Sequence, residues 1–150
     1  MFHLSLSLSI LLLINAFPTV FCLAGGLIGR VQSSGARGTL TCNGRPASQV
    51  LIKLYDDDRG IDMDDFMGET KSDSRGNFEV SGYIREMSPI DPKINIYHDC
   101  NDGFKPCQRK ISIMIPDGYI TEAKSPKKWY NAGTIELAGK FAGETRDCIH

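Results

Sequence analysis

The residues best suited to chemistry in this 150-residue chain are its cysteines, its three histidines and a run of aspartates. His98 alternates with Ile94 and Ile96, which is the period of a β-strand, so we expect a half-buried histidine rather than a catalytic one. Nucleophilic catalysis requires a base within hydrogen-bond reach, and the chain has no Gly-x-Ser-x-Gly nucleophile elbow. The sequence therefore predicts no catalytic residues and a protein that is not an enzyme.

Six carboxylates crowd the ten residues from Asp56 to Asp65. Carboxylate oxygens are calcium ligands, but this spacing does not match the EF-hand loop, which needs alternate acidic positions, a glycine at the sixth and a glutamate at the twelfth. We expect a solvated loop with no metal and no other cofactor. The alternatives are a surface for a protein partner and a calcium site, whose ligands would be Asp58, Asp62, Asp64 and Asp65.

Basic residues gather in two places, and either could face an anionic lipid surface, where each cation is worth about 1 kcal/mol. For the lysines, simple solvation is the favoured interpretation, and lipid-surface binding is the alternative. Trp129 and Tyr130 follow the second cluster, and we expect them to anchor the core at the start of a strand. The first cluster is Lys105, Arg109 and Lys110, and the second is Lys124, Lys127 and Lys128.

The first 29 residues contain no lysine, arginine, aspartate or glutamate, although the whole chain has 17 basic and 18 acidic residues. The apolar run that begins at Leu4, followed by Pro18 and small residues, predicts a secretory signal peptide over residues 1–24. Cleavage after Cys22 and an uncleaved membrane anchor are the alternatives. We therefore expect a secreted, extracellular protein with no transmembrane segment after cleavage. The near-neutral charge argues against a nucleic-acid partner.

Cleavage after residue 24 leaves four cysteines, and an even number in a small secreted chain predicts disulfides. Four cysteines allow three pairings. Cys100 and Cys107 enclose a short loop with Gly103 and Pro106, which favours a local bond between them and leaves Cys42 to pair with Cys148. A structural zinc site is disfavoured, because the spacing lacks the tight pair of ligands that such sites use.

The elements that must position these residues are predicted to be short strands. Apolar residues recur with period two, and Gly, Pro, Asn and Asp clusters mark the turns between them. Six or seven strands in about 110 residues indicate an all-β antiparallel sandwich over residues 25–138, and the polar segment 139–150 is a tail tied down by Cys148. The predicted strands are residues 37–41, 50–55, 78–81, 94–98, 111–115 and 133–137.

The order of motifs along residues 37–138 resembles the nematode transthyretin-like family of secreted proteins. The similarity is carried by RGTLTCNGRPA at 37–47, DFMG at 65–68, DSRGNFEVSG at 73–82, PKINIYHDC at 92–100 and IPDGYI at 115–120. The resemblance implies a transthyretin-like (prealbumin-like) β-sandwich of about seven strands, held by disulfides.

The same resemblance implies an extracellular binding or adaptor protein without catalytic activity. Its expected partners are an extracellular or cell-surface protein and an anionic phospholipid such as phosphatidylserine. Carriage of a small hydrophobic ligand is the alternative. A hydrolase of the hydroxyisourate type is a weaker one, because such enzymes use several histidines and a C-terminal Tyr-Arg-Gly-Ser motif, whereas this chain ends in Arg-Asp-Cys-Ile-His.

Overall fold

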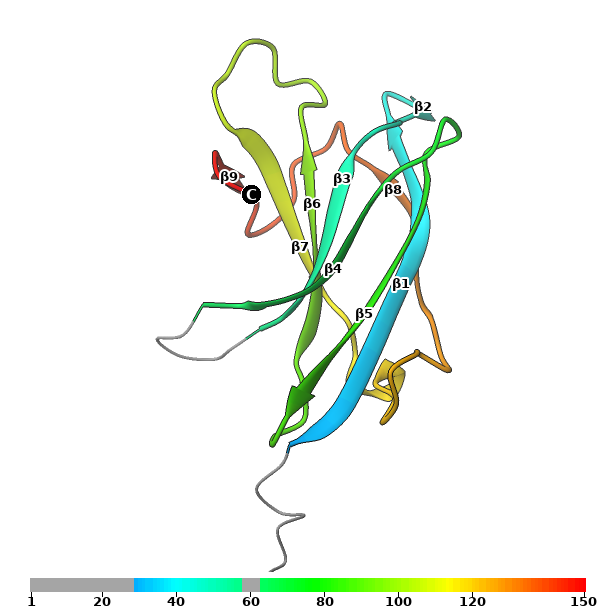
Figure 1. The fold of residues 1–150 in the computed structure, drawn as a ribbon. Helices are drawn as coiled ribbons and strands as arrows, with labels where there is room; N and C mark the ends of the chain where they lie inside the picture. The colour runs from blue at the N-terminus through cyan, green and yellow to red at the C-terminus, as the bar shows by residue number, and fades with distance from the viewer. Residues whose placement is uncertain (1–28, 58–62) are drawn as a thin grey trace, which may run out of the picture.

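The computed structural model describes residues 29–57 and 63–150, which form nine strands arranged as two sheets (Figure 1). The predicted signal peptide and two of the candidate calcium ligands, Asp58 and Asp62, lie outside the described residues. Within the described residues, no helix is long and apolar enough to cross a membrane. The prediction of an all-β sandwich is confirmed.

The first sheet is built around a single long strand, β1 (Arg30–Cys42). This strand pairs antiparallel with two partners and parallel with a third, so the sandwich is not antiparallel throughout. The antiparallel partners are β2 (Arg45–Pro46) and β5 (Asn77–Glu86), and the parallel one is β8 (Tyr130–Glu136).

The second sheet has five strands, and every neighbouring pair in it is antiparallel. Its two edges are β4 and the very short β9, which comes from the segment that the sequence suggested was a tail. The order across this sheet is β4 (Asp65–Lys71), β3 (Leu51–Asp56), β6 (Pro92–His98), β7 (Gln108–Met114) and β9 (Thr145–Asp147).

The core lies between the sheets and consists of the alternate side chains that the period-two pattern identified. Ile52 and Leu54 of β3 and Ile94 and Ile96 of β6 are fully buried. They meet apolar residues of the first sheet such as Leu40. Burying each such side chain contributes about 2 kcal/mol, so these alternating positions hold the two sheets together.

Strand β1 begins seven residues before the predicted strand at 37–41. Its first half is polar, yet Ser33 and Ser34 are fully buried. The reason is the segment 121–129, which pairs with the edge of the strand through backbone hydrogen bonds of 2.8 and 2.9 Å between Ser33 and Thr121, and which lays Pro126 and Trp129 over the outer face at Gly35. Both faces of this half-strand are therefore covered, and no alternation of polar and apolar residues marks it.

The predicted disulfide pairing is wrong. The structure joins Cys42 to Cys100 and Cys107 to Cys148, with Cα–Cα distances of 5.9 and 4.3 Å. Cys100 continues the inward face of β6 and meets the end of β1, so the first bond links the two sheets. Cys107 precedes β7, and the pairing of Gln108 with Asp147 brings it beside Cys148.

Candidate functional site

The β6–β7 loop, residues 99–107, projects from one end of the sandwich (Figure 1). Phe104 lies in this loop, and its side chain is fully exposed. Both ends of the loop are covalently fixed, because Cys100 is bonded to β1 and Cys107 to the C-terminal segment. The loop is therefore an anchored platform that presents an aromatic side chain to solvent.

Arg109 of β7 lies beneath this loop and is only 6% exposed, which contradicts its prediction as a surface residue. Its Nε and Nη2 atoms donate to the two carboxylate oxygens of Glu144 at 2.6 and 2.7 Å. Its Nη1 atom donates to the backbone carbonyls of Cys100, at 2.8 Å, and Leu137, at 3.2 Å. This bonding raises the pKa of Arg109 and lowers the pKa of Glu144.

A second arginine fastens the loop to β9. Arg146 donates from Nη1 to Oδ2 of the buried Asp102 at 2.8 Å and to the carbonyl of Cys107 at 2.9 Å. The hydrogen bonds from Arg146 lower the pKa of the Asp102 carboxyl. The loop and the C-terminal segment thus form one unit, held by a disulfide and two arginine–carboxylate pairs.

A cavity of about 320 Å³ opens between the loop and the C-terminal segment. Its charged lining has a net charge of +2, because four cationic side chains face two carboxylates. Both carboxylates are paired with arginines, whereas Lys105 and Lys140 are exposed and have no ion pair among the described residues. The charged groups that line it are Lys105, Arg109, Lys140, Arg146, Asp102 and Glu144.

The three residues of the first predicted basic cluster therefore do not share one surface. Lys105 remains on the surface of the loop and Arg109 is internal. Lys110 lies on the outer face of the second sheet, where its Nζ atom contacts Asp147 at 3.2 Å. Sequence reasoning missed Phe104 and Lys140. The available signal was an aromatic residue among Gly103, Lys105 and Pro106 in a loop bounded by cysteines.

The second basic cluster, Lys124, Lys127 and Lys128, lies in the segment between β7 and β8, and all three residues are exposed. This segment runs at the opposite end of the sandwich from the β6–β7 loop (Figure 1). The Nζ atom of Lys124 lies 5.6 Å from the ring centre of Tyr83. The described residues contain no salt bridge to any of the three lysines, so these three cations have no ion-pair partner there.

The two aromatic residues after this cluster have different environments. Tyr130 packs against the core and meets Tyr119 edge-to-face, with ring centres 5.4 Å apart. Trp129 lies instead on the outer face of the first sheet, where a Cβ on Gly35 would come within 2.9 Å of its ring. Tyr130 is thus the core anchor that the sequence predicted, while Trp129 covers the sheet from outside.

His98 is buried to 2% exposure, more deeply than predicted. Its Nδ1 atom accepts a hydrogen bond from the backbone N–H of Cys100 at 3.2 Å, and Nε2 has no partner among the described residues. Burial lowers the pKa of this histidine, so the ring is neutral at pH 7, with its proton on Nε2. It lines a mostly apolar cavity of about 280 Å³.

Ser48 and Asp99 line the same cavity as His98, but they do not form a catalytic triad with it. Among the described residues, no hydrogen bond joins His98 to either side chain, and Asp99 accepts one from Gln108 at 2.7 Å. The other described histidine, His150, stacks on Tyr97 with ring centres 4.5 Å apart. Because Tyr97 points away from the core face that His98 occupies, the two histidines cannot act together.

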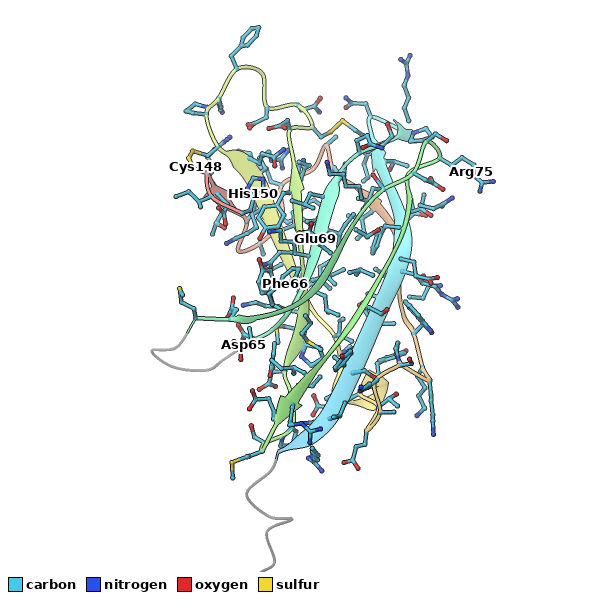
Figure 2. All side chains as sticks on the ribbon, in the orientation of Figure 1. Asp65, Phe66, Glu69, Arg75, Cys148 and His150 are labelled. Carbon is cyan, nitrogen blue, oxygen red and sulfur yellow. A yellow bond between two sulfur atoms is a disulfide. The ribbon has the colours of Figure 1, made fainter. Side chains whose placement is uncertain are left out.

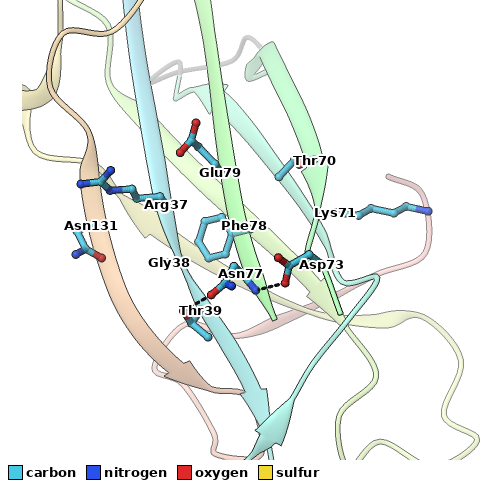
Figure 3. Close-up of a pocket in the computed structure, with 10 residues that line it drawn as sticks. All are labelled: Arg37, Gly38, Thr39, Thr70, Lys71, Asp73, Asn77, Phe78, Glu79 and Asn131. Carbon is cyan, nitrogen blue, oxygen red and sulfur yellow. Dashed lines mark hydrogen bonds between the residues drawn. The ribbon is translucent and has the colours of Figure 1, made fainter. Parts of the chain in front are cut away.

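An open groove of about 570 Å³ runs along β1, β5 and the turn before β5 (Figure 3). The polar residues at the turn are bonded to one another. Thr39 donates to Asn77 at 2.9 Å, and the backbone N–H of Asn77 donates to Asp73 at 2.8 Å. That backbone hydrogen bond is the main cause of the lowered pKa of Asp73. The turn end of the groove is therefore occupied by the chain's own hydrogen bonds.

The described residues hold no group of three or more His, Cys, Asp or Glu side chains able to bind a metal ion. Of the candidate calcium ligands that are described, Asp64 pairs with Lys93 at 2.7 Å, and Asp65 starts β4 (Figure 2). Lys93 also contacts Asp57. This lysine therefore draws together the two ends of the acidic run and neutralises part of its charge.

A model of the transthyretin-like family matches residues 37–116. This chain belongs to the transthyretin-like family. It is 62% identical over 124 residues to transthyretin-like protein 5 of Caenorhabditis elegans, covering 83% of this chain and 89% of that protein. Two further relatives come from the same nematode. Transthyretin-like protein 33 is 44% identical, and the match covers 87% of this chain and 92% of that protein. Transthyretin-like protein 2 is 45% identical, and the match covers 82% of this chain and 86% of that protein.

A solved structure of a 9R-lipoxygenase from Cyanothece PCC8801 is also similar to this transthyretin-like chain. The match covers 71% of this chain and 16% of the lipoxygenase, with 18% sequence identity and a TM-score of 0.41. A likeness at this level carries no argument about function. Family membership rests on the sequence comparisons, and it agrees with the two-sheet fold.

Proposed function

We propose that this transthyretin-like protein is a secreted extracellular binding or adaptor protein without catalytic activity. It presents loops of a rigid scaffold to a cell-surface protein and to an anionic phospholipid such as phosphatidylserine. The charge-free start of the chain and two disulfides support export to an oxidising compartment. The isolation of His98 from any described nucleophile supports binding rather than hydrolysis.

The observation that carries the proposal is the placement of two exposed surfaces at opposite ends of one disulfide-bonded sandwich (Figure 1). One end holds the anchored β6–β7 loop with Phe104, and the other holds Lys124, Lys127 and Lys128. Strand β7 leads from the first toward the second, so two partners can be held apart by the length of the domain. An adaptor requires this geometry, because simultaneous binding fails when two sites overlap.

The lipid part of the proposal is tested by flotation of the purified protein with vesicles. We expect binding to vesicles that contain phosphatidylserine and none to pure phosphatidylcholine. The triple variant K124E/K127E/K128E is expected to weaken this binding at least tenfold, since each lysine near such a surface contributes about 1 kcal/mol. The matched control is Lys71→Glu, an exposed lysine at the end of β4. Unchanged binding by the triple variant would remove this surface from the proposal.

A specific observation favours carriage of a small hydrophobic ligand as the second candidate. The cavity beside His98 is lined mainly by apolar groups, including Val50 and Leu137, and at about 280 Å³ it approaches the lower limit of small-molecule sites. Fluorescence titration with anilinonaphthalene sulfonate tests this candidate. We expect the fluorescence of the dye to increase with the wild-type protein and not with Val50→Trp. No increase with the wild-type protein would rule out this candidate.

A further inference from the structure

We propose that the β6–β7 loop and the cavity beside it form the docking site for an acidic protein partner. Phe104 enters an apolar pocket of that partner, and a partner carboxylate pairs with Lys105 and Lys140. This inference rests on the proposed role as a binding protein, and it adds the surface and the chemistry that this surface recognises.

Phe104 supplies the apolar contact. Its side chain is fully exposed in a disulfide-anchored loop, where it contributes nothing to the core. An exposed phenyl ring loses much of its unfavourable hydration when a partner pocket encloses it, and aromatic anchors of this kind dominate the energy of many interfaces. The ring is therefore placed as an anchor rather than as a packing residue.

The cavity supplies the charge. Arg109 and Arg146 each hold a carboxylate of the chain itself, and both pairs are complete before any partner arrives. Lys105 and Lys140 line the same cavity, but each is exposed and has no ion pair among the described residues. The excess charge of +2 thus belongs to these two lysines, and its complement is a carboxylate of a partner.

The anchoring of the loop lowers the cost of binding. The two disulfides and the Arg146–Asp102 pair fix the backbone on both sides of Phe104 in the unbound protein. A loop that is already ordered loses little conformational entropy when a partner binds, so more of the contact energy appears as affinity.

A protein surface fits this end better than a membrane. The site combines one aromatic side chain with a cavity whose lining contains both cations and paired carboxylates. Lipid-binding surfaces usually offer several apolar side chains and a denser group of unpaired cations. The lysine cluster at the other end, Lys124, Lys127 and Lys128, matches a charged lipid surface more closely.

The test uses the full disulfide-bonded protein labelled with ¹⁵N and a blocked peptide of alternating glutamate and leucine. A glutamine–leucine peptide of the same length is the uncharged control. We expect the acidic peptide to shift the amide resonances of residues 101–106 and 139–141 saturably, while the uncharged peptide leaves them in place. Equal shifts with both peptides, or none with the acidic one, would overturn the proposal.

Variants then assign the contacts. Phe104→Ala and K105E/K140E are each expected to weaken binding of the acidic peptide at least tenfold. The rest of the spectrum should not change, because all three side chains are exposed. The control variants are Met87→Ala, an exposed apolar residue in the β5–β6 connection, and Lys71→Glu. Affinities of Phe104→Ala or K105E/K140E that equal those of the controls would also overturn the proposal.

Vesicles of phosphatidylserine are the third arm of this experiment. Shifts of residues 101–106 by vesicles but not by the acidic peptide would make this end a membrane contact and overturn protein docking. The variant K124E/K127E/K128E separates this result from the proposed function. It is expected to lose vesicle binding and keep peptide binding, so the lipid surface and the docking site can each be disproved independently of the other.

Discussion

Charged side chains that look like surface residues in the sequence hold the functional end of this domain together. Arg109 is an example, because its guanidinium is enclosed by Glu144 and by three backbone carbonyls, one from the β6–β7 loop and two from the segment after β8. All of these contacts except the one to Cys100 join residues 28 to 35 positions apart, which the local sequence does not reveal. A buried ion pair of this kind is most informative when one member is removed.

Replacing Glu144 by Gln is expected to destabilise the domain by about 3 kcal/mol, because Arg109 then remains buried without its counter-charge. Urea unfolding followed by tryptophan fluorescence measures the change. Lys140→Gln, an exposed change four residues away, serves as the control and should stay within about 0.5 kcal/mol of the wild type. A Glu144→Gln variant as stable as this control would mean that water replaces the carboxylate.

Glu136 makes the stability of the domain depend on pH. Its carboxylate accepts hydrogen bonds from the backbone N–H groups of Asn43, Gly44 and Ala138, at 2.8, 2.8 and 2.9 Å, and from the Thr41 hydroxyl at 3.0 Å. These bonds lower the pKa of Glu136 from 4.5 to about 2. The carboxylate thereby joins β8 to the turn between β1 and β2.

Because the folded pKa is depressed, the stabilisation by Glu136 is fully present above pH 4.5 and is lost as the pH falls toward 2. Glu136→Gln is expected to lower the melting temperature at pH 7 and to flatten its fall between these pH values. Thermal melts followed by circular dichroism measure both effects. Glu79→Gln, on the exposed face of β5, is the control and should reproduce the wild-type profile. A wild-type profile in Glu136→Gln would contradict the assignment.

At the scale of elements, the sequence predicted the strands whose two faces differ. Strand β3 alternates in burial because one face meets the core, whereas β6 is buried on both faces and was recognised by the alternation of Ile94 and Ile96 with Asn95. The first half of β1 escaped prediction because the segment 121–129 covers its outer face with Pro126 and Trp129. The edge strand β4 escaped because its residues are nearly all half-buried or exposed. Local periodicity reveals a strand only where polar and apolar residue types alternate, and neither the first half of β1 nor β4 shows that alternation.

The two sheets also approach each other at glycines, where β4 crosses β5 (Figure 1). A Cβ on Gly68 would lie 2.6 Å from the carbonyl oxygen of Ser81, and a Cβ on Gly82 would lie closer still to the carbonyl of Met67. Both obstacles are backbone atoms, which cannot rotate away as a side chain can. The glycines thus allow one side of the sandwich to close.

Gly68→Ala is expected to destabilise the domain by about 2 kcal/mol, because the added methyl group forces the strands apart. Chemical denaturation measures the loss. Gly118→Ala is the matched control, since a Cβ there meets nothing within 4 Å and the backbone is not left-handed. Equal stability of the two variants would show that β4 can shift without cost.

For the whole molecule, the sequence predicted four bonded cysteines, and only their pairing was wrong. Loop length favoured Cys100 with Cys107, but the pairing depends on which chain ends the sheets bring together. Cys42 lies at the end of β1 beside Cys100, and β9 returns to the edge of β7. The two bonds consequently have different tasks: one joins the sheets, and the other holds the C-terminal segment against the docking end.

Because the two disulfides join different parts of the chain, we expect different results when each one is removed. On the chain-entropy view, loops of 58 and 41 residues contribute similar amounts, about 4 kcal/mol each. Cys42→Ser with Cys100→Ser is expected to lower protection from hydrogen exchange throughout both sheets. Cys107→Ser with Cys148→Ser is expected to release β9 first, since only three residues of β9 pair with β7.

Hydrogen exchange of the C107S/C148S variant therefore tests how the docking end is built. We expect the amides of β9 to lose protection while those of β3 and β6 keep it. Arg146 would then leave Asp102, the loop that carries Phe104 would gain freedom, and the acidic peptide should bind at least tenfold more weakly. Full protection of β9 in this variant would mean that the Arg109–Glu144, Arg146–Asp102 and Lys110–Asp147 pairs hold the segment without the disulfide. In that case rigidity of the loop would come from its ion pairs, and binding would survive reduction.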